Sequence, residues 1–322
     1  MFKTIQLKKL RVLGLFVLSI GTYLALEQWI DLRTKGFCLQ KILSSDIPYR
    51  SEWEAPSLLD GGEVDAILDQ PFHLIGAGSE CFAFASQDGK FVMKCFKLSF
   101  ARPVYYNKGL LAEDYSHYAG LFSNHPLLKK KWPDFLEKCK LKIFGIREFR
   151  IARTFLSSLL AYQHLKEETG LVYLHLNPTS SFHKNLTLID GSGIAHQIPV
   201  DATRFLLQKK ATPLETHLKN LIKQNKKEEL QQSIDSVFDL ILNRCKKGFS
   251  DRDFINRNVG FVDNHAIEID IGSFAPDPTM KDPLVYRKEI VFSTLDLRKW
   301  LKKNAPDTLD YFDEKIDRCR HH

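Results

Sequence analysis

Three polar side chains in the C-terminal third of the chain have types and spacing that suit metal-assisted chemistry. Asp253 follows a helical segment through a short loop, and Asn258 comes five residues later, directly before a strand. Asp270 ends the second strand of the hairpin that begins there. Because a hairpin returns its two ends to one edge, Asn258 and Asp270 should face one point, where amide and carboxylate oxygens suit Mg²⁺. Asp253 is placed to accept a proton from a hydroxyl, so the set predicts phosphoryl transfer.

The sequence around these residues resembles two motifs of the protein-kinase superfamily. Residues 251–258, DRDFINRN, are similar to the catalytic loop HRDLxxxN, with Asp in place of the usual His. Residues 270–272, Asp-Ile-Gly, are similar to the DFG motif, with Ile in place of Phe. The resemblance implies that Asp253 is the catalytic base and that Asn258 and Asp270 hold the metal. Another explanation is a capping Asp and a turn Asn–Asp pair in an unrelated α+β protein.

The turn between the first two predicted strands resembles the Gly-rich loop of the same superfamily. Gly76 and Gly78 are followed by Cys81, which stands where the family has a third glycine. Two small residues let backbone N–H groups approach phosphates. The loop lies between strands and not before a helix, which argues against a dinucleotide-binding motif. Lys94, one strand later in the segment FVMK, matches the family's phosphate-binding lysine, so the resemblance implies ATP and Mg²⁺ as cofactors.

The family's lysine pairs with a carboxylate on a helix. Glu148, near the start of the predicted helix Ile146–Leu165, is the best candidate to orient Lys94, with Glu113 and Glu137 as weaker candidates. Glu148 is equally explained as a first-turn residue that the helix dipole favours.

Residues 205–211, FLLQKKA, resemble the hinge that joins the two lobes of the superfamily. The resemblance implies that the backbone near Gln208 and Lys210 meets the adenine of ATP. In total it extends from about Phe72 to Phe274, with every expected part in order.

The chain after Gly272 departs from the pattern of a regulated protein kinase. The segment Ala-Pro-Asp at 275–277 comes too soon to end an activation segment, and only 50 residues follow Gly272. We therefore expect a reduced C-lobe, as in relatives that act on lipopolysaccharide cores, sugars and other small molecules. The sequence predicts an ATP- and Mg-dependent phosphotransferase whose hydroxyl acceptor is a protein, a (glyco)lipid or a small molecule. The alternative is a membrane-anchored pseudokinase-type binding module without catalysis.

The elements that must position these residues follow from hydrophobic periodicity, which predicts the strands and helices of an α+β protein. The resemblance implies that these elements form a bilobal, protein-kinase-like fold. Residues 31–70 are expected as a linker or a cap on the lobe. A β-rich N-lobe is expected over 71–210, with an insertion at about 98–145, and a shortened helical C-lobe over 211–322. Long helices are predicted at Ile146–Leu165 and Glu228–Lys246.

Residues 1–30 predict a basic flank followed by a membrane segment. The apolar run Val12–Leu26, extended to Ile30, reaches the ~20 residues that cross a bilayer. No small-residue cleavage site follows, which favours a single-pass anchor over a removed signal peptide. A buried helix of a soluble domain is the third alternative. The basic flank favours a cytoplasmic N-terminus, whereas Arg33 and Lys35 leave the orientation open, and the kinase-like domain is expected on the ATP-containing side.

The composition is that of a globular protein, with 44% hydrophobic and 26% charged residues. The net charge of +7 suits anionic partners such as phosphate or an acidic membrane face. The lysine runs at 129–131 and 223–227 carry no interleaved aromatic residues, so no nucleic acid is expected. Six cysteines without zinc-ligand spacing predict reduced thiols and leave one or two disulfides open.

Overall fold

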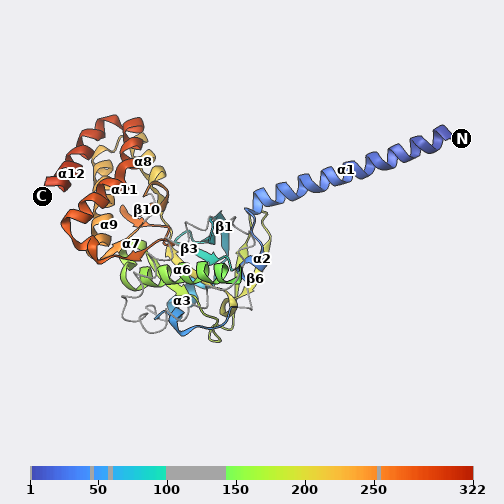
Figure 1. Ribbon diagram of the computed structural model, residues 1–322, viewed down its shortest axis with the longest axis horizontal. Helices are drawn as coiled ribbons and strands as arrows, with labels where there is room; N and C mark the ends of the chain where they lie inside the picture. Colours follow the sequence, from blue (N-terminus) through green and yellow to red (C-terminus); the bar gives the residue numbers. More distant parts are fainter. Residues whose placement is uncertain (1, 44–46, 57–60, 99–142, 252–254, 322) are drawn as a thin grey trace.

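The computed structural model describes residues 2–43, 47–56, 61–98, 143–251 and 255–321. They form a mixed α+β structure with a β-rich part, a helical C-terminal part and a projecting N-terminal helix (Figure 1). Most of the insertion expected at about 98–145 lies outside the described residues. So does Asp253.

A seven-stranded sheet in the order β4-β7-β3-β2-β1-β5-β6 forms the β-rich part. Three consecutive strands, β1, β2 and β3, form an antiparallel meander, and β7 and β4 continue it beyond β3. The hairpin of β5 and β6 extends the other edge, where β5 runs parallel to β1. The strand bounds are β1 Phe72–Ala77, β2 Cys81–Ser86, β3 Phe91–Phe96, β4 Leu171–His175, β5 Asn185–Ile189, β6 Ala195–Pro199 and β7 Phe205–Lys209.

Alternate side chains of these strands enter two different cores, as the two-residue period of a strand requires. Phe96 and Leu206 pack with α6 (Ile143–His164) on one face, together with the buried Trp53. Met93 and Leu207 point to the opposite face. The sheet is therefore covered on both sides.

Residues 35–68 supply the cover of that second face. Phe37, Ile42, Val64 and Leu68 are all buried there against the sheet. The ring of Phe37 meets Phe82 edge-on, with the centroids 5.2 Å apart. Of the two alternatives for this segment, a linker and a cap on the lobe, these contacts are those of a cap. It contains α2 (Leu39–Ile42), the 3-10 turn η1 (Ser51–Trp53) and α3 (Gly61–Leu68).

Helices packed on a short hairpin form the C-terminal part. Residues from α8, α9, α11 and α12 share one core with the hairpin of β10 and β11. Two two-residue strands, β9 and β12, pair with each other on either side of the segment that holds Asn258 and Asp270. The bounds are α7 Lys166–Thr169, η2 Val200–Ala202, β8 Thr212–Pro213, α8 Leu214–Lys223, α9 Lys227–Lys246, β9 Phe249–Ser250, α10 Ile255–Asn258, β10 Val259–Val262, β11 His265–Glu268, β12 Ala275–Pro276, η3 Pro278–Lys281, α11 Pro283–Asn304, η4 Pro306–Thr308 and α12 Leu309–His321.

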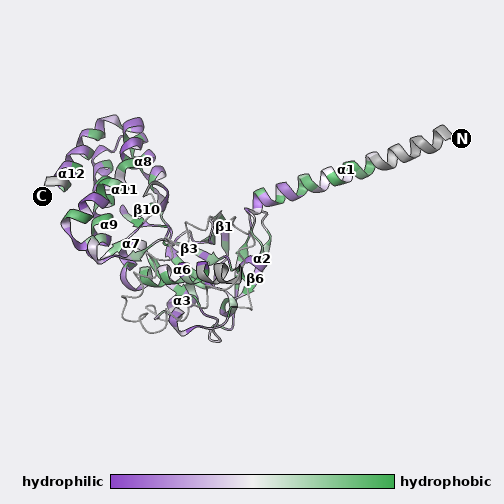
Figure 2. Cartoon of the chain, viewed as in Figure 1, coloured by the Kyte–Doolittle hydropathy of each residue, from purple (hydrophilic) through white to green (hydrophobic). Residues whose placement is uncertain are grey.

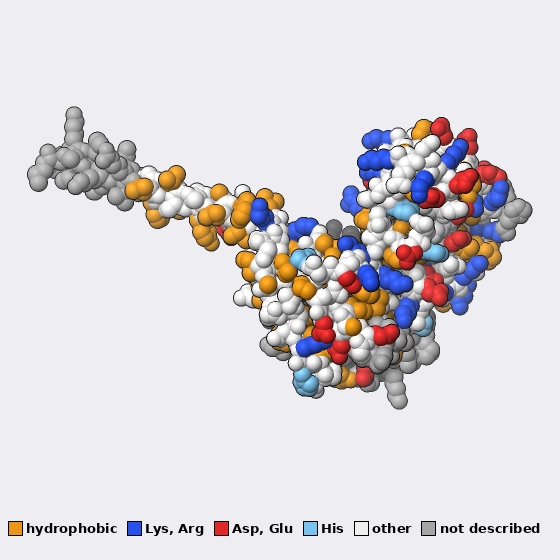
Figure 3. All heavy atoms as spheres, turned by 180° about the vertical axis from the view of Figure 1, so that it is seen from behind, with side chains coloured by type: hydrophobic (Ala, Val, Ile, Leu, Met, Phe, Trp, Pro, Cys, Tyr) orange, Lys and Arg blue, Asp and Glu red, His pale blue; other side chains and the backbone are white. Residues whose placement is uncertain are grey.

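The N-terminal helix α1 (Phe2–Thr34) extends away from the rest of the molecule (Figure 1). Its stretch Gly14–Thr34, 21 residues long, is long and apolar enough to cross a membrane and is unburied. Figure 2 shows hydrophobic residues along this stretch and polar ones at the end that joins the β-rich part. Figure 3 shows its hydrophobic side chains projecting into the open. An apolar, unburied helix near the N-terminus is typical of an anchor or a signal sequence.

Candidate functional site

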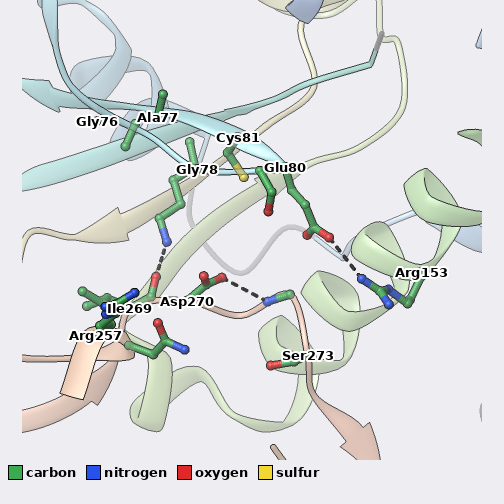
Figure 4. Close-up of a pocket in the computed structure, with 15 residues that line it drawn as sticks. Gly76, Ala77, Gly78, Glu80, Cys81, Arg153, Arg257, Ile269, Asp270 and Ser273 are labelled. Carbon is green, nitrogen blue, oxygen red and sulfur yellow. Dashed lines mark hydrogen bonds and ion pairs between the residues drawn. The ribbon is translucent and has the colours of Figure 1, made fainter. Parts of the chain in front are cut away.

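A cavity of about 690 Å³ lies between the β1–β2 turn and the segment around Asp270. That volume is within the ordinary range of small-molecule sites. Figure 4 shows residues of the β1–β2 turn on one side and Arg257, Ile269 and Asp270 on the other. Five residues that we predicted from sequence line this cavity: Gly76, Gly78, Lys94, Asn258 and Asp270.

The hairpin of β10 and β11 brings Asn258 and Asp270 together. Its register pairs Val259 with Glu268, so the residues just outside the hairpin lie opposite each other. The N–H of Ile269 donates to the carbonyl oxygen of Asn258 at 2.6 Å, which closes the open end. The side chain of Asp270 is exposed to the cavity, and its Oδ1 accepts a hydrogen bond of 3.4 Å from the Gly272 N–H. An amide and a carboxylate at one end of a hairpin are a donor set that fits Mg²⁺.

Lys94 reaches this end of the hairpin from β3. Its register partners are Ala83 on β2 and Leu206 on β7. Its ammonium group donates to the carbonyl oxygen of Ile269, next to Asp270. The expected partner Glu148 lies on α6, but its side chain is not among those that the structure describes. The Lys94–Glu148 pair therefore stays a prediction.

Helix α6 contacts the site through two residues that sequence reasoning missed. Arg153 pairs with Glu80 of the β1–β2 turn, with Nη2 and Oε1 3.3 Å apart. The hydroxyl of Ser157 donates to the carbonyl oxygen of Ile271 and accepts from the Phe274 N–H at 3.1 Å. Ser157 thereby holds the segment after Asp270 against the helix.

The β1–β2 turn uses part of its hydrogen-bonding capacity internally. The N–H of Gly78 donates to the carbonyl oxygen of Cys81 at 2.9 Å. The Gly78 carbonyl accepts from the ammonium group of Lys97 at 2.5 Å. Burial raises the pKa of the Cys81 thiol to about 12, so this side chain stays protonated at the cavity wall. The Gly78 N–H, which we expected to approach phosphate, is already engaged.

The structure does not bring Gln208 and Lys210 to this cavity. The Gln208 side chain is buried and donates to the carbonyl oxygens of Thr169 and Glu268, at 2.6 and 3.0 Å. The Lys210 N–H donates to the Lys90 carbonyl at 2.8 Å, and its side chain is exposed. Gln208 thus joins β7 to α7 and β11, and its contact with adenine stays a prediction.

A buried ion cluster, also missed from sequence, fixes the start of the predicted catalytic loop. Arg244 of α9 lies 2.8 Å from Glu268 and 3.2 Å from Asp251 through Nη1, and 2.9 Å from Glu289 through Nη2. Asp251 also accepts a hydrogen bond from the Ser273 hydroxyl. One feature of the sequence could have indicated this cluster, namely that residue 251 is Asp where the kinase motif has His. A buried Asp needs a cation, and Arg244 on the preceding helix is that cation.

The pH dependence of stability should reveal Glu268 within this cluster. Burial raises the pKa of the Glu268 carboxyl to about 8, against the attraction of Arg244. Between its ordinary value of 4.5 and about 8 the folded chain holds a proton that the unfolded chain releases, so this group's contribution to stability falls as pH rises. We expect Glu268→Gln, which cannot ionise, to gain stability relative to the unmodified chain from pH 5.5 to 8.5.

Thermal unfolding midpoints across this pH range test the prediction. Glu215→Gln, which removes an exposed carboxylate that pairs with Lys219, is the matched control and should follow the unmodified chain. A constant difference between Glu268→Gln and the unmodified chain over the whole range would show that Glu268 does not titrate there.

No protein-family model matches the chain, and no curated protein matches it. Nineteen chains of solved structures match it, and two of them are described here. One is described as the bifunctional kinase-methyltransferase WbdD, with 15% identity and a TM-score of 0.29 over 67% of this chain and 34% of that one. The other is described as a complex of Rv3197 with erythromycin from Mycobacterium tuberculosis, with 11% identity and a TM-score of 0.30 over 74% of this chain and 60% of that one.

The chain thus spans about a third of the first protein and three fifths of the second. Of the two, only the first is described as a kinase. At these TM-scores we infer nothing further about this chain from either protein.

Proposed function

We propose that the chain is an ATP- and Mg-dependent phosphotransferase of the protein-kinase-like superfamily, and that it moves the γ-phosphoryl group to a hydroxyl acceptor. The observation that carries this proposal is one cavity lined by Gly76, Gly78, Lys94, Asn258 and Asp270. These residues come from three distant segments of the sequence, each of which resembles a motif of the same superfamily. The strand order β4-β7-β3-β2-β1 supports the proposal of a β-rich N-lobe, and the separate hairpin of β10 and β11 supports that of a smaller C-lobe.

In this proposal each side chain has a role that fits its surroundings. Asp270 and Asn258 would hold Mg²⁺, which when bound neutralises developing charge on phosphate oxygens. Lys94 would bind the α- and β-phosphates, and its present acceptor, the Ile269 carbonyl, keeps its ammonium group beside Asp270. Asp253 is proposed as the base that takes the acceptor's proton, and Glu148 as the residue that orients Lys94.

The proposed acceptor is a hydroxyl group of a protein, a (glyco)lipid or a small molecule. The fold does not select among these three classes, because a fold defines a scaffold and only the site defines the substrate. Helix α1 is proposed as a single-pass anchor, with the remainder of the chain on the ATP-containing side. Its unburied stretch Gly14–Thr34 is about as long as a bilayer span. Trp29 and Arg33 near the end of this stretch suit the membrane interface.

Binding of nucleotide is the first test. A ligand that binds only the folded state raises the unfolding midpoint, by about 2.7 kcal/mol of stability at a hundred times the dissociation constant. We expect Mg·ATP at millimolar concentration to raise the midpoint of the full chain in detergent by several degrees. Lys94→Gln should lose most of this shift, whereas Lys303→Gln, the same change at an exposed position of α11, should keep it.

A second candidate function is a membrane-anchored binding module without catalysis. The observation that favours it is the contact of Lys94 with a backbone carbonyl, together with the engaged N–H of Gly78. The thermal-shift measurement separates the two candidates. If millimolar Mg·ATP left the midpoint unchanged, the phosphotransferase proposal would be wrong and the silent module would take its place.

A further inference from the structure

The Glu80–Arg153 pair places a carboxylate in the space that the phosphates of a nucleotide would enter. Glu80 lies in the β1–β2 turn and Arg153 on α6, and both side chains line the cavity (Figure 4). The carboxylate also reaches the opposite wall, because a Cβ added to Gly272 would lie 2.8 Å from Glu80 Oε2. Glu80 therefore spans from the turn to the segment that follows Asp270.

This position is electrostatically unfavourable for phosphate binding while the pair is intact. Glu80 and Asp270 border the same cavity, so an entering phosphate meets two carboxylates. Mg²⁺ held by Asp270 would offset the charge of that carboxylate, whereas Glu80 would have to share Arg153 with the phosphate. The carboxylate must move aside or give up its cation.

Part of the hydrogen-bonding capacity of the turn is already engaged. The Gly78 N–H is donated to Cys81, and Lys97 is bound to the Gly78 carbonyl. A side-chain cation at the same place would make up for the engaged backbone donor. Arg153 is that cation, since its guanidinium already holds an anionic oxygen there at 3.3 Å.

The pair is also weak enough to exchange. Its side chains are 29% and 21% exposed, and ion pairs in contact with water contribute little to stability. Phosphate carries more charge than a carboxylate and matches the planar fork of an Arg side chain. Exchange of a carboxylate for a phosphate at Arg153 is therefore favourable.

We propose that Arg153 is a phosphate-binding residue and that Glu80 occupies its guanidinium until the phosphates of the nucleotide displace the carboxylate. This inference rests on the nucleotide binding proposed above. It assigns to α6 a role in which the helix contributes a cation directly to the nucleotide, in addition to any carboxylate that it contributes to Lys94.

Two substitutions with opposite effects test the exchange. Dissociation constants for Mg·ATP, Mg·tripolyphosphate and adenosine are measured on the full chain in detergent. Glu80→Gln should bind both phosphate compounds several-fold more tightly, and Arg153→Gln roughly tenfold more weakly. The double variant should bind both phosphate compounds more tightly than Arg153→Gln, because the repelling carboxylate is gone, and more weakly than Glu80→Gln, because the cation is gone. Adenosine binding should be the same in all variants, and Glu215→Gln, which breaks an exposed pair on α8, should match the unmodified chain.

Each outcome decides between the two proposals. If the chain binds Mg·ATP and Arg153→Gln binds it equally well, the role of Arg153 is wrong and the nucleotide proposal stands. Weaker binding by Glu80→Gln would show that Glu80 supports the turn and does not compete with phosphate. If tripolyphosphate follows the expected pattern but Mg·ATP does not bind, the phosphate site stands without the nucleotide. Binding of neither compound overturns both proposals. Arg153→Lys, which keeps the charge but not the planar fork, should bind both phosphate compounds with an affinity between those of the unmodified chain and Arg153→Gln. It serves if Arg153→Gln fails to fold, and unchanged affinity would then show that Arg153 does not bind phosphate.

Discussion

Replacing Asp270 by asparagine is expected to lower phosphate transfer from ATP by at least about a thousandfold. The substitution leaves the size of the side chain unchanged and removes the negative charge that would hold Mg²⁺. Metal stabilisation of transferring phosphate is worth several kcal/mol, and about 4 kcal/mol corresponds to three orders of magnitude in rate. Because Asp270 is exposed to the cavity and has only a 3.4 Å contact with the Gly272 N–H, the fold should not change.

Release of phosphate from ATP in the absence of an acceptor measures this effect, since water replaces the hydroxyl. The matched control lies at the other end of the same hairpin. Asp263 has φ +48 in the β10–β11 turn, and asparagine tolerates this left-handed conformation. Asp263→Asn should therefore be as active as the unmodified chain. If Asp270→Asn released phosphate as fast as the unmodified chain, Asp270 would not be a metal ligand. The assignment of residues 270–272 to a DFG-like motif would then be wrong.

Local patterns explain how much of the fold could be predicted from sequence. The sequence pattern predicts strands at Phe72–Ile75, Cys81–Ala85 and Phe91–Phe96, and β1, β2 and β3 lie within two residues of these bounds. β6 was missed, because His196 and Gln197 make Ala195–Pro199 a polar edge strand. The pattern also predicts a helix around Ser293–Lys302, but α11 already begins at Pro283, after an Asp282 cap that accepts from the Leu284 N–H at 2.8 Å.

The packing of residues 35–68 could not be inferred from any period. Phe37, Ile42, Val64 and Leu68 have irregular spacing, and short elements connect them. Their burial depends on the face that the completed sheet presents, which is a property of strands far along the chain. Only the tertiary structure specifies it.

The candidate site also has some features that the local sequence predicts and others that only the tertiary structure specifies. The meeting of Asn258 and Asp270 was predictable because one short hairpin joins them. The pairing of Glu80 with Arg153 joins residues 73 positions apart, and no local rule selects Arg153 from the other charged residues of α6. The backbone near Gln208 was expected to meet a ligand, and nothing in the sequence indicated the direction of its side chain. Both faces of β7 are buried, so the side-chain amide donates to neighbouring backbone. Residue type and spacing identify candidates, whereas the direction of a side chain depends on long-range packing.

Replacing Arg244 by methionine is expected to destabilise the fold by about 3–5 kcal/mol, because it leaves buried carboxylates without their cation. Arg244 is 1% exposed and contacts Glu268, Asp251 and Glu289 from one position. The unfolding midpoint should fall by on the order of 10 °C. Asp251 precedes Asn258 in the sequence and Glu268 follows it, so the loss of Arg244 should also disorder the proposed metal site.

A second arginine, which forms an ion pair at the surface, shows whether the loss of stability depends on burial or on ion pairing alone. Arg298 of α11 makes a two-pronged contact with Asp313, at 2.7 and 2.6 Å, but its side chain is 42% exposed. Arg298→Met should cost little stability, since water replaces the partner. If Arg244→Met unfolded at the same temperature as Arg298→Met, the buried cluster would not hold the predicted catalytic loop, and other contacts of Asp251, such as that with Ser273, would have to fix it.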